Sequence, residues 1–204
     1  MKKIVFGLTG SIASGKSTVS GMFKNMTIPV FDADEGVHRL MRESKDMKAL
    51  FSRKFPQTVN DRGIDRKKLS DMVNDGLIDV RQLESMIHPF LEQELRLFYE
   101  RHFYEPILVL DIPLLFEAKW DKFCDETIVL TADLLILRQR ALSRPGMTIE
   151  KYNILKSRQM SDEEKIKRAT CTIDTGASLE DVRNKVEQIV EDARNRLGHG
   201  NNGS

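Results

Sequence analysis

One short segment has the residue types and the spacing needed to bind a polyphosphate. Residues 10–17 read Gly-Ser-Ile-Ala-Ser-Gly-Lys-Ser, which satisfies the pattern G-x-x-x-x-G-K-[ST] in full. The glycines let the backbone wrap until its N–H groups converge on phosphate oxygens, and the helix that follows directs its positive end at the same anion. Lys16 would neutralise the β- and γ-phosphates of ATP, and the Ser17 hydroxyl would ligate Mg²⁺. The predicted nucleotide-binding residues are Gly10, Ser11, Ile12, Ala13, Ser14, Gly15, Lys16, Ser17 and Thr18.

Carboxylates follow two other predicted strands. Asp111 comes after the apolar run 107–110 and could arrange Mg²⁺ and its waters, or it could cap the turn that follows. Asp32 and Asp34 end the short strand 29–31, at the edge where open α/β sheets bind ligands. A carboxylate there could accept the proton of an attacking hydroxyl, or it could only form a local turn. We expect only one of the two to face the site.

The stretch 138–168 holds nine Lys and Arg residues against four acids. Most of these lysines are expected on a solvated helix face, which is the usual place for a run of charge. Arg140 and Arg144 differ because they lie four residues apart on one predicted helix face, just before Pro145-Gly146. Arginines on a mobile flap bring positive charge onto a transferring phosphoryl group and exclude water. This pair therefore predicts a lid.

The composition narrows the class of protein. The chain has 204 residues, 40% of them hydrophobic and 31% charged, with a formal net charge of +1. This balance favours a globular protein without nucleic acid or membrane as a partner. The two cysteines, Cys124 and Cys171, have neither metal-ligand spacing nor the density of a disulfide scaffold, and no stretch reaches the length of a membrane span. We expect a cytoplasmic protein.

Short strands and longer helices alternate outside the middle of the chain. Apolar runs predict strands at 4–9, 29–31, 107–110, 127–130 and 171–173. Helices are expected at 16–25, 133–143, within 147–168, and from a capping box at Ser178-Asp181 to about Leu197. Strands separated by helices indicate an α/β fold with a mostly parallel sheet covered on both faces. Residues 35–105 contain no convincing strand and read as several helices, with a turn at 60–63 and a break at His88-Pro89.

In this order, the landmarks of the chain resemble those of the dephospho-coenzyme A kinase family. They span about residues 4–176. The matching stretches are Gly7 to Thr18, Asp32-Ala33-Asp34, Gly63 to Leu69, His88-Pro89, Asp111-Ile112-Pro113-Leu114-Leu115-Phe116-Glu117, Arg140 to Arg144, and Ile173-Asp174-Thr175-Gly176.

The resemblance implies a reaction and a domain plan. The reaction is ATP-dependent phosphorylation of the ribose 3′-hydroxyl of 3′-dephospho-CoA, the final step of coenzyme A synthesis. The implied fold is a three-layer P-loop kinase fold with a parallel five-stranded sheet, a helical substrate-binding insert and a lid. The implied parts are a core at 1–34 and 106–198 with the lid at about 140–168, a helical acceptor-binding domain at 35–105, and a disordered tail at 199–204.

The resemblance also implies residue roles. Asp34 would be the base for the ribose hydroxyl, with Lys16, Arg140 and Arg144 as further catalytic residues. The substrate side would include Asp34, His88, Leu114 and Glu117, and the metal ligands would be Ser17 and Asp111. The chain departs from the family at a few positions: Ser11 and Ala13 stand where glycine is common, Leu137 where Gln is frequent, and Thr175 where Asn is frequent.

Two other functions remain open at this point. A kinase of the same fold that acts on a nucleoside, a nucleotide or a sugar would use the same loop and the same base. A nucleotide-binding scaffold without turnover would keep the loop alone, although Lys16, Ser17, Asp111 and the basic lid weigh against it. A GTPase-type switch is disfavoured because the nearest Asn-Lys-x-Asp match, Asn184-Lys185-Val186-Glu187, ends in Glu and lies in the last helix.

Overall fold

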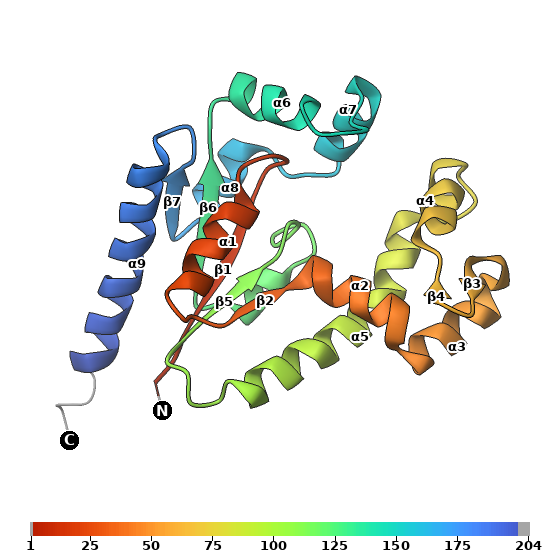
Figure 1. Ribbon diagram of the computed structural model, residues 1–204, viewed down its shortest axis with the longest axis horizontal. Coiled ribbons are helices and arrows are strands. Elements are labelled where there is room, and N and C mark those ends of the chain that lie inside the picture. Colours follow the sequence, from red (N-terminus) through yellow and green to blue (C-terminus); the bar gives the residue numbers. More distant parts are fainter. Residues whose placement is uncertain (1, 200–204) are drawn as a thin grey trace. The chain divides into compact units, whose positions relative to one another are not determined.

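The computed structural model describes residues 2–199 and divides into two compact units (Figure 1). The first unit comprises Met1–Phe31 and Tyr104–Ser204, and the second comprises Asp32–Phe103. The second unit covers the region where the sequence predicts a helical acceptor-binding domain at 35–105. Of the tail predicted at 199–204, His199 is the last residue of a helix, and residues 200–204 lie outside the described part.

A five-stranded sheet forms the centre of the first unit. Its strand order is β2-β5-β1-β6-β7, so that β1 is the middle strand. The strands β1 and β5, β1 and β6, and β6 and β7 pair in parallel. The prediction of five strands in an α/β sheet is confirmed. The strand bounds are β1 Ile4–Gly10, β2 Val30–Asp32, β5 Ile107–Asp111, β6 Glu126–Thr131 and β7 Cys171–Asp174.

Two helices cover one face of this sheet. They are α1, Lys16–Asn25, and α9, Leu179–His199, which pack beside each other. Val19 and Phe23 of α1 join one buried cluster with the strand residues Phe6 and Leu8 and with Val186 of α9. Every residue of β1 is buried, as expected for a central parallel strand covered on both sides. Val19 and Phe23 fix α1 against this face of the sheet, and the phosphate-binding loop that precedes α1 is held in place with it.

The opposite face is also buried. Val5, Leu108, Leu110 and Val129 point to that side and are almost fully shielded from solvent. The helix α8, Asp162–Arg168, contacts β6 there. The remaining elements of the first unit are η2 Trp120–Phe123, α6 Leu134–Leu142 and α7 Ile149–Ser157.

The basic segment 147–168 forms two helices instead of one. The helix α7 ends at Ser157, and Ser161 starts α8 by accepting a hydrogen bond from Glu164 N–H. Between them, residues 158–161 form a short irregular connection. The connection belongs to the predicted lid and, as described below, contacts the phosphate-binding loop.

The second unit is mainly helical. Each helix begins at a side-chain cap that accepts a backbone N–H, and these caps are Asp32, Ser44, Asp65 and Asp79. The helices are α2 Ala33–Glu43, α3 Lys45–Lys54, α4 Arg66–Asn74 and α5 Val80–Arg101, with a 3₁₀ turn, η1, at Pro56–Thr58.

Two expectations for this unit are wrong. The first is that residues 35–105 contain no strand: the turn predicted at 60–63 is present, but it joins a small antiparallel pair of strands, β3 Val59–Asn60 and β4 Gly63–Ile64, which are too short to show a periodic pattern. The predicted break at His88-Pro89 is absent, because α5 continues through Pro89. Proline removes one intrahelical hydrogen bond, but Ile87, Leu91 and Leu95 form a buried stripe along the helix. Burial of that stripe outweighs the lost bond.

One further property concerns membranes. Across residues 2–199, none of the helices combines the length and the apolarity that a bilayer span requires.

Candidate active site

The phosphate-binding loop connects β1 to α1, and its two glycines are required for different reasons. At Gly10 a Cβ atom would lie 2.9 Å from the carbonyl oxygen of Leu130, which belongs to the neighbouring strand β6. At Gly15 the φ angle is 82°, in the left-handed region that side chains disfavour. Ala13 adopts φ 65° without being glycine. The loop therefore has the wrapped shape predicted from its sequence, and Ala13 is strained within it.

The start of α1 is open to an anion. Gly15 precedes the helix without a side-chain cap, and the first turn contains no acidic residue. Most helix starts place a polar side chain on their first N–H groups, as all four helices of the second unit do. The first N–H groups of α1 and the helix dipole are thus available for a phosphate.

Lys16 and Asp111 form an ion pair in this loop. The Lys16 Nζ lies 2.5 Å from Asp111 Oδ1, and the Asp111 side chain is only 2% exposed. Asp111 reaches this place because β1 and β5 pair in register, with Leu8 opposite Asp111. The sequence placed both residues in the site, and the structure brings them together.

Ser17 and Asp111 are chemically suited to Mg²⁺. Ser17 lines the pocket next to the loop, and Asp111 supplies a buried carboxylate beside Lys16. Mg²⁺ commonly takes only one or two protein oxygens and completes its shell with phosphates and waters. No cluster of three or more His, Cys, Asp or Glu side chains suited to a metal occurs in the part of the chain that the structure describes. A magnesium site here would therefore depend on the nucleotide.

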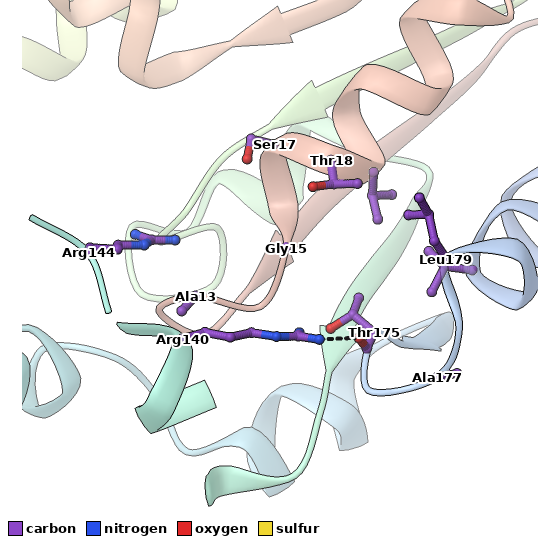
Figure 2. Close-up of a pocket in the computed structure, with 11 residues that line it drawn as sticks. Ala13, Gly15, Ser17, Thr18, Arg140, Arg144, Thr175, Ala177 and Leu179 are labelled. Carbon is purple, nitrogen blue, oxygen red and sulfur yellow. Dashed lines mark hydrogen bonds between the residues drawn. The ribbon is translucent and has the colours of Figure 1, made fainter. Parts of the chain in front are cut away.

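The two predicted lid arginines line the same pocket as the loop. This pocket has a volume of about 350 Å³, and Figure 2 shows Arg140 running past Ala13 toward Thr175. The Arg140 Nη2 donates to the carbonyl oxygen of Thr175 at 3.0 Å, and Arg144 borders the pocket from the end of the predicted lid helix. Positive charge from the lid is thus placed beside the phosphate-binding loop.

Two positions where the chain departs from the family pattern have structural explanations. The Thr175 hydroxyl donates to the carbonyl oxygen of Thr131 at 3.0 Å, which fixes the turn after β7. Leu137 is 2% exposed and packs in the core beneath α6. Leu137 therefore offers no hydrogen-bonding group, whereas Thr175 lines the pocket with its hydroxyl proton already donated to Thr131.

The second unit contains two of the predicted site residues. Asp32 accepts a hydrogen bond from Glu35 N–H at 3.0 Å and caps α2, whereas Asp34 is exposed in the first turn of that helix. The two carboxylates therefore differ as expected: Asp32 ends β2 and caps α2, whereas Asp34 lies inside that helix. His88 is half-buried on α5.

The remaining predicted substrate residues, Leu114 and Glu117, lie after β5 in the first unit. Leu114 is half-buried. Glu117 Oε1 accepts a hydrogen bond from Met160 N–H at 2.7 Å and lies 3.2 Å from Lys165 Nζ. Glu117 thus contacts the lid, and its role toward a substrate stays a prediction.

Sequence reasoning missed several residues of this region. The lysines of 147–168 were mostly expected in solvent, but for Lys165 this is wrong, because its side chain is fully buried against Glu117. Gln159 and Asp162 contact the phosphate-binding loop and were not singled out. Their separation from the loop along the chain leaves no local pattern that could have revealed them.

Comparison with known proteins agrees with this geometry. The family model described as "Dephospho-CoA kinase" matches residues 4–181. A dephospho-CoA kinase from Mesorhizobium japonicum is 44% identical over 197 residues, which cover 96% of this chain and 99% of the relative.

Solved structures show the same fold. A Thermus thermophilus protein superposes with a TM-score of 0.80 at 32% identity, covering 94% of this chain and 98% of that chain. A dephospho-CoA kinase from Campylobacter jejuni superposes with a TM-score of 0.68 at 24% identity, covering 97% of this chain and 98% of its own. Since the family model and the relative both extend over nearly the whole chain and the loop, ion pair and arginines form one site, this chain belongs to the dephospho-CoA kinase family.

Proposed function

We propose that this chain transfers the γ-phosphoryl group of ATP to the ribose 3′-hydroxyl of 3′-dephospho-CoA, giving ADP and coenzyme A. The observation that carries this proposal is the family match over residues 4–181 together with an intact phosphate-binding loop. Relatives named dephospho-CoA kinase from several organisms, at about 40% identity over nearly their full length, support it. The reaction is the last step of coenzyme A synthesis.

In the proposed mechanism, the first unit binds and polarises ATP. The open N–H groups at the start of α1 and the ammonium of Lys16 neutralise the β- and γ-phosphates. Arg140 and Arg144 add positive charge from the lid, where charge builds up on the transferring group. Ser17 and Asp111 would hold Mg²⁺, which would supply positive charge to offset that of the phosphates.

Asp34 is the proposed general base. A carboxylate within reach of the ribose 3′-hydroxyl can take its proton as the oxygen attacks the γ-phosphorus. Asp34 is suited to this because it is exposed, whereas its neighbour Asp32 is used as the helix cap. We further propose that the unit Asp32–Phe103 binds the acceptor and that His88 and Leu114 contribute to its recognition.

Another kinase of the same fold is the main competing function. The discriminating experiment is release of ADP with Mg²⁺-ATP and one acceptor at a time, chosen from dephospho-CoA, adenosine, AMP, shikimate and gluconate. We expect turnover with dephospho-CoA and formation of coenzyme A. Turnover with a different acceptor only would reject the proposed substrate, and ATP binding without turnover on any acceptor would favour a scaffold.

The proposed compartment is the cytoplasm. Cys124 and Cys171 are both free thiols, which is the state expected in a reducing compartment. Localisation of a tagged chain by microscopy or fractionation would test this.

A further inference from the structure

The first half of the phosphate-binding loop is held by residues from the lid. Ser11 Oγ donates a hydrogen bond to Asp162 Oδ1, and Ile12 N–H donates to Gln159 Oε1 at 3.0 Å. Both acceptors come from the connection between α7 and α8 or from the first residue of α8. Two consecutive loop residues are therefore fixed from the same side.

A lysine adds a third contact to this arrangement. Lys156 Nζ lies 3.3 Å from Ser11 Oγ and 3.1 Å from Asp162 Oδ2. Ser11 is 3% exposed, and the side chains of Lys156 and Asp162 are 29% and 23% exposed. Hydrogen bonds to ionised groups that are largely shielded from water are stronger than neutral ones. Ser11, which stands where the family commonly has glycine, supplies the hydroxyl that these contacts need.

The connection between α7 and α8 and the helix α8 itself are also held by contacts to Glu117. Met160 N–H donates to Glu117 Oε1 at 2.7 Å, and the fully buried Lys165 pairs with the same oxygen at 3.2 Å. Glu117 belongs to the loop after β5, the strand that ends at Asp111. Residues near Gln159 and Asp162 along the chain are thus tied to Glu117, in addition to the contact of Asp162 with Lys156 of α7.

These contacts adjoin the most strained part of the loop. Ala13 has φ 65°, which side-chain-bearing residues rarely adopt, and it directly follows the two fixed residues. A strained conformation persists only where its surroundings impose it. Gln159 accepts a hydrogen bond from the N–H of Ile12, and the Ser11 carbonyl oxygen accepts one from the N–H of Ser14, so neither of these two loop N–H groups is left to bind phosphate.

We propose that Gln159 and Asp162 are positioning residues that hold the phosphate-binding loop in its anion-binding shape and thereby set the affinity for ATP. The inference rests on the proposed function only in that ATP is the nucleotide bound. Without these contacts, ATP would have to impose the strained shape itself, and its binding would weaken by that cost.

The test compares variants by calorimetric titration with ATP and by steady-state kinetics. Asp162→Ala removes an acceptor with charge, and we expect the Kd for ATP to rise about tenfold. Gln159→Leu keeps the volume but removes a neutral acceptor, and we expect a rise of about fivefold. The KM for ATP should follow, whereas kcat and the KM for dephospho-CoA should stay within about twofold of native.

Two control variants separate positioning from general damage. Glu163→Ala removes the same charge from the same helical turn at an exposed side chain, and it should bind ATP like the native chain. Asp162→Asn keeps an oxygen that can accept from Ser11, so it should bind ATP more tightly than Asp162→Ala. Thermal unfolding of each variant identifies any that fail to fold, and if Asp162→Ala is one of them, Ser11→Ala and Gln159→Leu carry the test because each removes one contact of the loop.

A double-mutant cycle tests the specific contact. Ser11→Ala and Asp162→Ala should each weaken ATP binding, and the double variant should be no weaker than the worse single variant, since both remove one contact. Additive losses would overturn the proposal. So would unchanged ATP affinity in Asp162→Ala and Gln159→Leu, or tighter binding, which would mean that Gln159 competes with phosphate.

The titration with ATP needs no acceptor, which keeps the two proposals distinguishable. A native chain that binds ATP and shows the expected losses in the variants, but does not turn over dephospho-CoA, would contradict the proposed substrate alone. A native chain that converts dephospho-CoA while its variants bind ATP normally would contradict the positioning role alone.

Discussion

The ammonium of Lys16 lies 2.5 Å from the carboxylate of Asp111, at the junction of the phosphate-binding loop with the end of β5. The Asp111 side chain is 2% exposed and that of Lys16 is 20% exposed. A buried carboxylate requires a compensating charge, so Lys16 serves the fold in addition to its task toward phosphate. This double role makes its removal informative in two ways.

Lys16→Met should lower both turnover and stability. Phosphate binding loses its principal charge, and the Asp111 carboxylate is left without its ion-pair partner, which should cost about 1–3 kcal/mol of unfolding free energy. Adding Asp111→Asn removes the buried negative charge, so the double variant should recover part of the stability but none of the activity. Urea denaturation measures the stability of each variant, and ADP release measures its turnover. Equal stability of the native chain and Lys16→Met would show that the pair is not needed for folding.

Asp34→Asn should reduce kcat by about 10²-fold or more, the usual contribution of a general base. The KM for ATP should change little, because Asp34 lies outside the unit that holds the loop. Asp32→Asn is the matched control, since Asn caps a helix as well as Asp and the exchange is chemically the same. Near-native turnover of Asp34→Asn would remove Asp34 from the base role, and a large loss in Asp32→Asn alone would move the role to Asp32.

The two lid arginines should give different kinetic signatures. Arg140 is fixed on the Thr175 carbonyl inside the pocket, so Arg140→Met should mainly raise the KM for ATP. Arg144 lies in the same pocket, and Arg144→Met should mainly lower kcat, by about 10²-fold, if it stabilises charge on the transferred group. Arg138→Met is an exposed control on the same helix. If Arg138→Met were as impaired as the other two, net charge of the helix, not specific contact, would explain the losses.

Cys124 predicts a loss of stability at alkaline pH. Burial, helped by the nearby carboxylates of Asp121 and Asp125, raises the pKa of its thiol to about 12. The unfolded thiol titrates near pH ~8.5. Above pH ~8.5 the unfolded chain releases the thiol proton, whereas the folded chain keeps it. The free energy of unfolding is therefore undiminished by this thiol below pH ~8.5 and falls as the pH rises toward about 12. We expect the melting temperature of Cys124→Ala to fall less steeply between about pH 8.5 and 10 than that of the native chain. Equal falls in the two melting temperatures would contradict this prediction.

Much of the first unit could be predicted because its signals are local. The apolar run of β1 and the loop motif define the start of α1 at Lys16, and the stripe of Val182, Val186 and Val190 defines α9. Burial on both faces of a parallel sheet makes such runs conspicuous. That Lys16 and Asp111 lie in one site followed from the same logic, because the ends of parallel strands meet at one edge, but the ion pair between them was not predicted.

The errors arose where tertiary contacts override a local preference. Pro89 normally ends a helix, but the buried stripe of α5 maintains it. Lys165 has the charge of a surface residue and is nevertheless buried, because Glu117 lies opposite it after the chain has folded. Gln159 is similar, since only the folded chain brings its amide to the N–H of Ile12.

The central position of β1 has a consequence for how the protein is made. The loop that follows β1 leaves the ribosome early, yet its partners Asp111, Gln159 and Asp162 are synthesised much later. Contacts between such distant residues are slow to form, and they cannot form before both partners exist. A nascent chain that ends at Pro145 would carry the whole nucleotide-binding motif and Asp111, but it would lack Gln159 and Asp162. ATP should therefore reach its full affinity only for a chain that has emerged past α8, which would make tight nucleotide binding a late event in its co-translational folding.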